Sequence, residues 1–105
     1  MSTSPTQRTL AEMRGRGFPL VQVTERWNAF AKVRQDLYGI IDVLCVSDTE
    51  IVGVQATSGS NVAARITKIT ESEALPILRR AGIRVLVHGW AKREGRWQLR
   101  EVDLS

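Results

Sequence analysis

The fold of this chain is decided by the stretch Gly39-Ile-Ile-Asp-Val-Leu-Cys-Val-Ser-Asp-Thr-Glu-Ile-Val-Gly-Val-Gln-Ala-Thr57. Residues 40–46 are apolar except for Asp42, and residues 51–54 are apolar throughout. The four residues between them, 47–50, carry polar side chains of the kind that hydrogen-bond their own backbone in a tight turn. The stretch therefore predicts two strands that pair as an antiparallel hairpin.

Asp42 is the exception in the first of these strands. Burying an unpaired carboxylate is unfavourable, so we expect Asp42 to lie at a strand end, in a pair or beside a cation. Gln55 and Thr57 are two residues apart and therefore project from one face of the second strand. In an antiparallel hairpin the end of the second strand lies beside the start of the first. Asp42, Gln55 and Thr57 are thus predicted to converge on one face.

The rest of the chain supplies further helices and strands. Apolar spacing predicts helices over residues 5–16, 62–69 and a short stretch ending at 80, and strands over residues 18–24, 83–90 and 97–104. A strand, a helix and a strand follow one another between residues 54 and 85, so those two strands are expected to be parallel. The predicted fold is α/β, with a single mixed β-sheet of about five strands flanked by helices.

Length and composition indicate one globular domain. The 105 residues are 43% hydrophobic and 25% charged, which is typical of a folded chain. We expect the domain to span residues 1–105, with residues 1–6 as a disordered lead-in. No apolar run approaches the roughly 18 residues that cross a bilayer, and the first residues lack the pattern of a signal peptide. A cytoplasmic location without membrane contact is therefore predicted.

The charge balance favours nucleic acid as a partner. The net charge is +4, and the basic residues comprise twelve arginines and three lysines. The planar guanidinium of arginine matches the geometry of phosphate, which favours DNA. A basic surface that only keeps the protein soluble is the alternative explanation.

Residues 25–35 are expected to form a long connection rather than a regular element. Within it, basic residues alternate with Trp27 and Phe30, a combination that suits contact with phosphates and stacking on bases. In the alternative interpretation the two rings pack the loop onto the core. The loop 92–96 between the last two strands is either a solvated turn or a second contact with phosphate. The candidate DNA-binding residues are Arg26, Lys32, Arg34, Arg65, Lys68, Lys92, Arg93 and Arg96.

A longer pattern extends the central hairpin. Gly39-Ile-Ile-Asp42-Val-Leu is followed by a turn and by an apolar strand that ends in Gln55-Ala56-Thr57, before a Ser-Gly pair and a helix. In this pattern the chain resembles the PD-(D/E)XK nuclease superfamily, most of all its small phage-type and Holliday-junction-resolvase-type members. The resemblance implies a restriction-endonuclease-like core, DNA as the substrate, and Mg²⁺ or Mn²⁺ as the cofactor.

The resemblance also implies roles for individual residues. The catalytic residues would be Asp42, Gln55, Thr57 and, from the first helix, Glu12. The metal ligands would be Asp42, the side-chain oxygen of Gln55 and the backbone carbonyl of Ala56. Two positions depart from the family motif, because Gln55 stands in place of a glutamate and Thr57 in place of a lysine.

The chemistry of phosphodiester hydrolysis explains why these substitutions matter. Mg²⁺ requires oxygen ligands at near-octahedral geometry, and the metal lowers the pKa of the attacking water. The amide of Gln55 carries one negative charge less than a carboxylate, which should weaken Mg²⁺ binding, and Thr57 supplies no cation. Asp36, whose loop leads into the strand of Asp42, is a further candidate acid. The cations that replace the lysine, if they reach the site, are Arg65 and Lys68 of the next helix or Lys32 and Arg34 of the loop.

Three functions are compatible with these patterns. The first is a metal-dependent DNA endonuclease of phage or bacterial origin, acting through the modified Asp42…Gln55-x-Thr57 site and as a homodimer if it cuts both strands. The second is a catalytically degenerate DNA-binding module on the same fold. The third is a protein-interaction domain in which Trp27 and the terminal hairpin form the contact surface.

Overall fold

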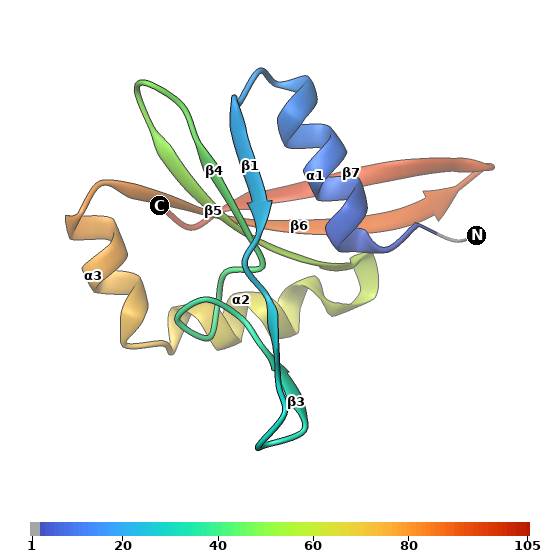
Figure 1. Cartoon of the computed structure of the whole chain (residues 1–105). Coiled ribbons are helices and arrows are strands. Elements are labelled where there is room, and N and C mark those ends of the chain that lie inside the picture. The colour runs from blue at the N-terminus through green and yellow to red at the C-terminus, as the bar shows by residue number, and fades with distance from the viewer. Residues whose placement is uncertain (1–2) are drawn as a thin grey trace.

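The structure is a computed structural model that describes residues 3–105 (Figure 1). Its helices are α1 (Pro5–Gly15), α2 (Val62–Thr70) and α3 (Ala74–Arg80), with a short 3₁₀ helix, η1 (Gly59–Asn61), directly before α2. Its strands are β1 (Leu20–Val23), β2 (Arg26–Asn28), β3 (Val33–Gln35), β4 (Val43–Val46), β5 (Ile51–Ser58), β6 (Ile83–Arg93) and β7 (Arg96–Asp103).

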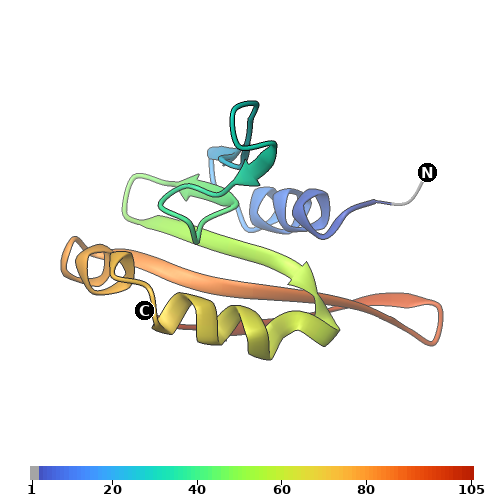
Figure 2. The same cartoon turned by 90° about the horizontal axis from the view of Figure 1, so that it is seen from below.

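Five strands form one mixed sheet in the order β1-β4-β5-β6-β7, and β2 and β3 form a separate hairpin. Strands β5 and β6 are parallel, whereas the other neighbours in the sheet are antiparallel. Helix α1 lies on one side of the sheet, and α2 and α3 lie on the other (Figure 2). The predicted α/β fold, with a mixed sheet of five strands flanked by helices, is thus confirmed.

The two faces of the sheet bury separate apolar clusters, because side chains alternate along each strand. On the α1 side, Leu10 and Met13 of the helix pack with Val52 and Val54 of β5. On the other side, the buried residues of α2 and α3 pack against alternate positions of β6 such as Val85. Burial on both faces fixes the register of the strands, and with it the positions of polar residues at the strand ends.

Two glycines allow neighbouring segments to approach the α2 side of the sheet closely. A Cβ atom on Gly53 would lie 2.6 Å from Cδ1 of Ile41, and one on Gly89 would overlap Cγ2 of Val62. Neither position has room for a side chain. The absence of a side chain at these two positions lets the loop before Asp42 and the start of α2 lie against the same face of the sheet.

Three segments differ in detail from the sequence-based expectation. Residues 25–35, expected as an irregular connection, contain β2 and β3 and form a hairpin that projects from the body (Figure 1). Strand β6 extends to Arg93, beyond the expected end at residue 90, and β7 begins at Arg96, one residue earlier than expected. Glu94 and Gly95 are left as a two-residue turn, for which their positive φ values of 53° and 76° are suited. Strand β4 begins only after Asp42, so this residue lies at a strand end.

Helix α1 begins within the predicted lead-in, whose residues 1 and 2 lie outside the described residues. Pro5 stands in its first turn, and the hydroxyl of Ser4 accepts a 3.2 Å hydrogen bond from the N–H of Gln7. Both features favour helix initiation at this point. Across residues 3–105, no helix has the length and apolar character that a membrane crossing requires.

Candidate functional site

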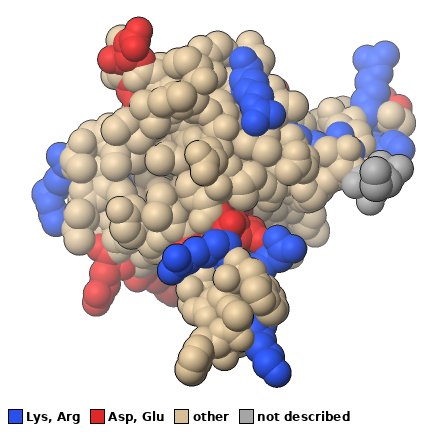
Figure 3. Space-filling view, viewed as in Figure 1, with Lys and Arg blue, Asp and Glu red and all other residues tan. Residues whose placement is uncertain are grey.

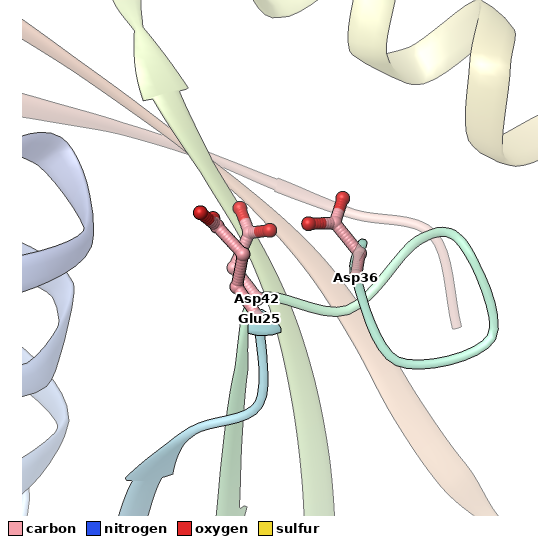
Figure 4. Close-up of side chains that lie close together, drawn as sticks. All are labelled: Glu25, Asp36 and Asp42. Atoms are coloured by element: carbon pink, nitrogen blue, oxygen red, sulfur yellow. The ribbon is translucent and has the colours of Figure 1, made fainter. Parts of the chain in front are cut away.

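Three carboxylates converge at one end of the central hairpin (Figure 4). One oxygen from each of Glu25, Asp36 and Asp42 lies within 4.8 Å of the other two. Glu25 lies between β1 and β2, Asp36 directly follows β3, and Asp42 directly precedes β4. The three acids line a pocket of about 250 Å³, in which Asp42 is the most deeply buried at 3% exposure.

Backbone hydrogen bonds explain why these acids meet. The N–H of Thr24 donates to the carbonyl of Asp42 at 2.7 Å, so the next residue, Glu25, is held beside Asp42. In the turn of residues 37–41 the first and last residues hydrogen-bond each other in both directions, at 2.8 and 3.0 Å. This closure places Asp36 and Asp42 at the two ends of one tight turn.

Asp42 is held by hydrogen bonds from β5. Its Oδ2 accepts from Nε2 of Gln55 at 2.6 Å and from the backbone N–H of Ala56 at 2.9 Å. Nε2 of Gln55 also donates to Oδ2 of Asp36 at 3.2 Å. Asp42 and Gln55 meet as expected from their positions in the hairpin, because β4 and β5 pair antiparallel.

Two cations border the acid cluster. Nζ of Lys68, on α2, lies 3.3 Å from Oδ2 of Asp36 and 3.5 Å from Oε1 of Gln55. Nη1 of Arg34, on β3, lies 3.0 Å from Oε1 of Glu25. In Figure 3, basic side chains stand on both sides of an acidic patch at the base of the projecting hairpin. Lys68 therefore places a cation beside the polar end of β5, which carries no basic residue.

Burial and crowding change the proton affinity of two of the acids. Burial, together with the nearby Asp36, raises the pKa of Asp42 to about 7, although hydrogen bonds from Ala56 and Gln55 oppose the change. Burial also acts to raise the pKa of Asp36, but its hydrogen bonds with Asp42 and Gln55 and the charge of Lys68 bring that pKa below its usual value. The pair therefore carries fewer than two full negative charges near neutral pH.

Two of the residues implied by the family resemblance lie outside the cluster. Glu12 is on α1, where it pairs with Arg16 at 2.8 Å, on the opposite side of the sheet from α2. Thr57 is 5% exposed and is on the same face of β5 as Gln55, yet the described residues that line the acid pocket do not include it. The structure thus brings Asp42 and Gln55 together and leaves Glu12 and Thr57 apart from them.

Glu25 is the member of the cluster that sequence reasoning missed. It stands at the start of the segment expected to be an irregular connection. The signal that could have found it is its place directly after an alternating strand. β1 is part of that strand and pairs with β4, so Thr24, which follows β1, lies beside Asp42, which precedes β4, and Glu25 comes next to them.

The predicted DNA-binding residues fall into three groups. Arg26, Lys32 and Arg34 belong to the β2–β3 hairpin, Arg65 and Lys68 line the acid pocket from α2, and Lys92, Arg93 and Arg96 lie at the far end of β6 and β7. A groove of about 430 Å³ near that far end is lined by Arg93 and Arg100 together with Gly59 and Gly89. The acid pocket is thus flanked by basic residues of the hairpin and of α2.

Comparison of the chain with protein-family models, with curated proteins and with solved structures finds no match. The chemistry of the site is the basis for assigning a function. Its main features are three carboxylates, a lysine beside them and two arginines, Arg34 and Arg65, that line the same pocket.

Proposed function

We propose that this protein is a metal-dependent DNA endonuclease in which Glu25, Asp36 and Asp42 bind Mg²⁺ or Mn²⁺. The observation that carries the proposal is the meeting of these carboxylates with Lys68 in one pocket. Like charges at such short range are unfavourable unless a cation compensates them. Metal-assisted phosphodiester hydrolysis uses carboxylates to bind a divalent cation, and a nearby basic residue stabilises the charge that develops on the phosphate.

The donor set of the pocket fits a hard divalent cation. Mg²⁺ and Mn²⁺ prefer carboxylate and carbonyl oxygens, which the three acids supply. The carbonyl of Ala56 is a further donor, since the N–H and C=O of a strand residue point to the same side and this N–H faces Asp42. Gln55 offers its oxygen only after its amide rotates, because Nε2 faces Asp36 and Asp42.

A bound metal would supply polarisation of the phosphate and a lower pKa for the attacking water. Hydrolysis forms a bond from the water oxygen to phosphorus and breaks the bond from phosphorus to the departing sugar oxygen, which takes up the proton that the water releases. Lys68 is placed to orient that water or to neutralise charge that develops on the phosphate. Arg34 and Arg65, which line the same pocket, are placed to bind neighbouring phosphates, a contact that carries no sequence preference.

A second candidate is a DNA-binding module on the same fold that does not cleave. This candidate is favoured because residues of the protein itself already neutralise the negative charge of the acids. Lys68 and Arg34 already pair with two of the acids, and the amide of Gln55 donates to Asp36 and Asp42. Such a cluster keeps its structure without a metal.

Incubation of supercoiled plasmid with Mg²⁺, with Mn²⁺ and with a chelator separates the two candidates. The endonuclease proposal predicts nicking that requires a metal and that is lost in Asp42→Asn and in Asp36→Asn. Asp48→Asn is the matched control, because Asp48 is an exposed acid in the β4–β5 turn, and it should nick like the wild type. Early appearance of linear plasmid would indicate a homodimer that cuts both strands.

Each other outcome also decides a point. Nicking by Asp42→Asn at the wild-type rate would contradict the assignment of the metal ligands. Salt-sensitive DNA binding without cleavage in any metal would support the second candidate.

A further inference from the structure

The β2–β3 hairpin presents aromatic and basic side chains away from the core. Trp27 is 61% exposed and Phe30 is fully exposed, so the expectation that both rings pack the segment onto the core is contradicted. Residues 26–35 contain three basic residues and no acidic residue. The hairpin itself projects from the body of the molecule (Figure 1). Two large aromatic rings exposed to water on so short a segment indicate a surface that contacts a partner.

The hairpin has a defined structure at its tip. Strands β2 and β3 pair along their whole length. Oδ1 of Asn28 accepts hydrogen bonds from the N–H groups of Phe30, at 3.0 Å, and of Ala31, at 3.1 Å. This side-chain turn fixes the backbone that carries Phe30. A pre-formed tip loses less conformational entropy when a partner binds.

The hairpin starts and ends at the candidate metal centre. Glu25 directly precedes β2, and Asp36 directly follows β3. Phe30 is five residues beyond Glu25 in the sequence, a reach of at most about 17 Å in extended backbone. One strand of DNA rises about 3.4 Å per nucleotide, so the tip reaches bases at most about five nucleotides from a phosphate held at the carboxylates.

The side chains of the hairpin match an unpaired segment of DNA. Every base has a flat face on which an aromatic ring stacks, and the phosphates attract lysine and arginine. In an intact duplex these faces are covered by neighbouring bases, so no base face is accessible for Phe30 to stack on. Cross-strand pairing places Trp27 and Arg34 on one side of the hairpin and Arg26 on the other, so both sides carry a cation.

We propose that the β2–β3 hairpin binds DNA that contains unpaired bases, with Phe30 stacked on one of them. The stacked base lies within about five nucleotides of the cleaved phosphate. The place of that phosphate rests on the proposed function, whereas the stacking contact does not. The preferred substrate class is duplex DNA with a bubble or a single-stranded flank, and intact duplex is bound through its phosphates alone.

Binding measured in the presence of a chelator tests this contact without cleavage. A labelled duplex and a duplex of the same length with a short central bubble are titrated with the wild type, Phe30→Ala and Ile77→Ala. Ile77, on α3, is 60% exposed and controls for the loss of an exposed apolar side chain. Phe30→Ala should bind the bubble at least about fivefold more weakly and the intact duplex unchanged, whereas Ile77→Ala should keep the bubble preference of the wild type.

A second readout comes from the emission of Trp27. Addition of bubble DNA should quench a part of the tryptophan emission that is missing in Trp27→Phe. This variant retains an aromatic ring and should keep its affinity for the bubble. Quenching of the same size in wild type and variant would show that Trp27 does not meet a base.

The remaining outcomes separate this inference from the endonuclease proposal. Equal binding of the two DNAs by the wild type, or an unchanged bubble preference in Phe30→Ala, would overturn the stacking contact. A bubble preference in a protein that cleaves no DNA with any metal would overturn the endonuclease proposal alone. Failure to bind either DNA would overturn both.

Discussion

The side-chain amide of Gln55 donates a 2.6 Å hydrogen bond to the carboxylate of Asp42 inside the candidate metal centre. Both side chains are almost completely buried, at 2% and 3% exposure. A neutral amide stabilises the buried carboxylate without adding charge, whereas a glutamate in its place would repel it. Gln55 therefore makes the metal-free site more stable and its attraction for a cation weaker.

Replacement of Gln55 by glutamate should reverse this balance. We expect metal-free Gln55→Glu to be less stable than the wild type by about 1–3 kcal/mol, because the buried hydrogen bond to Asp42 is replaced by repulsion. The variant should bind Mn²⁺ more tightly, since the site gains a negative charge. Chemical unfolding with a chelator and calorimetric titration with Mn²⁺ measure the two effects. An unchanged Mn²⁺ affinity would contradict the placement of Gln55 at the metal.

The free energy of unfolding of the metal-free protein should depend on pH through Asp42. The pKa of Asp42 is about 7 in the folded chain and near 3.8 in the unfolded chain. Between these values the folded state keeps a proton that the unfolded state releases. The stabilisation is therefore complete below about pH 4 and is lost as the pH rises to about 7. Asp42→Asn should gain stability relative to the wild type over this rise.

Two other groups must be separated from this effect. Burial lowers the pKa of His88, so its contribution has the opposite sign and is lost as the pH falls below about 6.5. Asp36, whose pKa is lowered, acts only below its usual value of 3.8. The informative quantity is thus the difference in unfolding free energy between Asp42→Asn and the wild type, measured with chelator from about pH 4 to about pH 8. A constant difference would contradict the raised pKa of Asp42.

Lys68 should matter far more for cleavage than for folding. Its side chain is 42% exposed, and a partly exposed ion pair contributes roughly 0–1 kcal/mol. Lys68→Ala should therefore unfold near the wild-type temperature and nick plasmid about 100-fold more slowly, because a cation at the reacting phosphate is lost. Lys92→Ala is the matched control and should weaken DNA binding without slowing the cleavage of bound DNA. Equal slowing in the two variants at saturating protein would count against a specific role for Lys68.

The meeting of Asp42 and Gln55 follows from the sequence because it depends on local geometry. Side chains alternate along a strand, and a short turn leaves one register for the hairpin. The arrival of Glu25 and Asp36 depends instead on which strand pairs with β4 and on how tightly the turn of residues 37–41 closes. Neither is encoded in the spacing of apolar residues.

Lys68 and the β2–β3 hairpin show two further limits. Apolar spacing predicts the helix of Lys68, but its reach to the acids depends on where α2 lies, which follows from the contact of Val62 with Gly89. Strands of three residues, as in β2 and β3, are too short to display alternation. The parallel pairing of β5 and β6 is confirmed, because a strand–helix–strand order leaves few possible topologies.

A polar network on the α1 side of the sheet links the buried residues Thr9 and His88 with Trp90 and Glu101. Oγ1 of Thr9 accepts from Nε1 of Trp90 at 3.0 Å and lies 3.1 Å from Nδ1 of His88. Nε2 of His88 lies 2.8 Å from Oε2 of Glu101. When the imidazole is neutral, the hydroxyl of Thr9 donates its hydrogen bond to Nδ1 of His88, and His88 donates from its protonated Nε2 to Glu101.

Removal of this hydroxyl should destabilise the protein without affecting cleavage. Thr9 and His88 are fully buried. Thr9→Val therefore removes the partner of Nδ1 of His88 and of Nε1 of Trp90, at a site where water does not replace the lost hydroxyl. We expect a loss of about 1–3 kcal/mol in unfolding free energy. Thr9→Ser retains the hydroxyl and should lose less. The measurement is urea unfolding of both variants beside a plasmid-nicking assay. Wild-type stability in Thr9→Val would show that the network does not stabilise the fold. Slower nicking by the folded variant would show that the network contributes to cleavage.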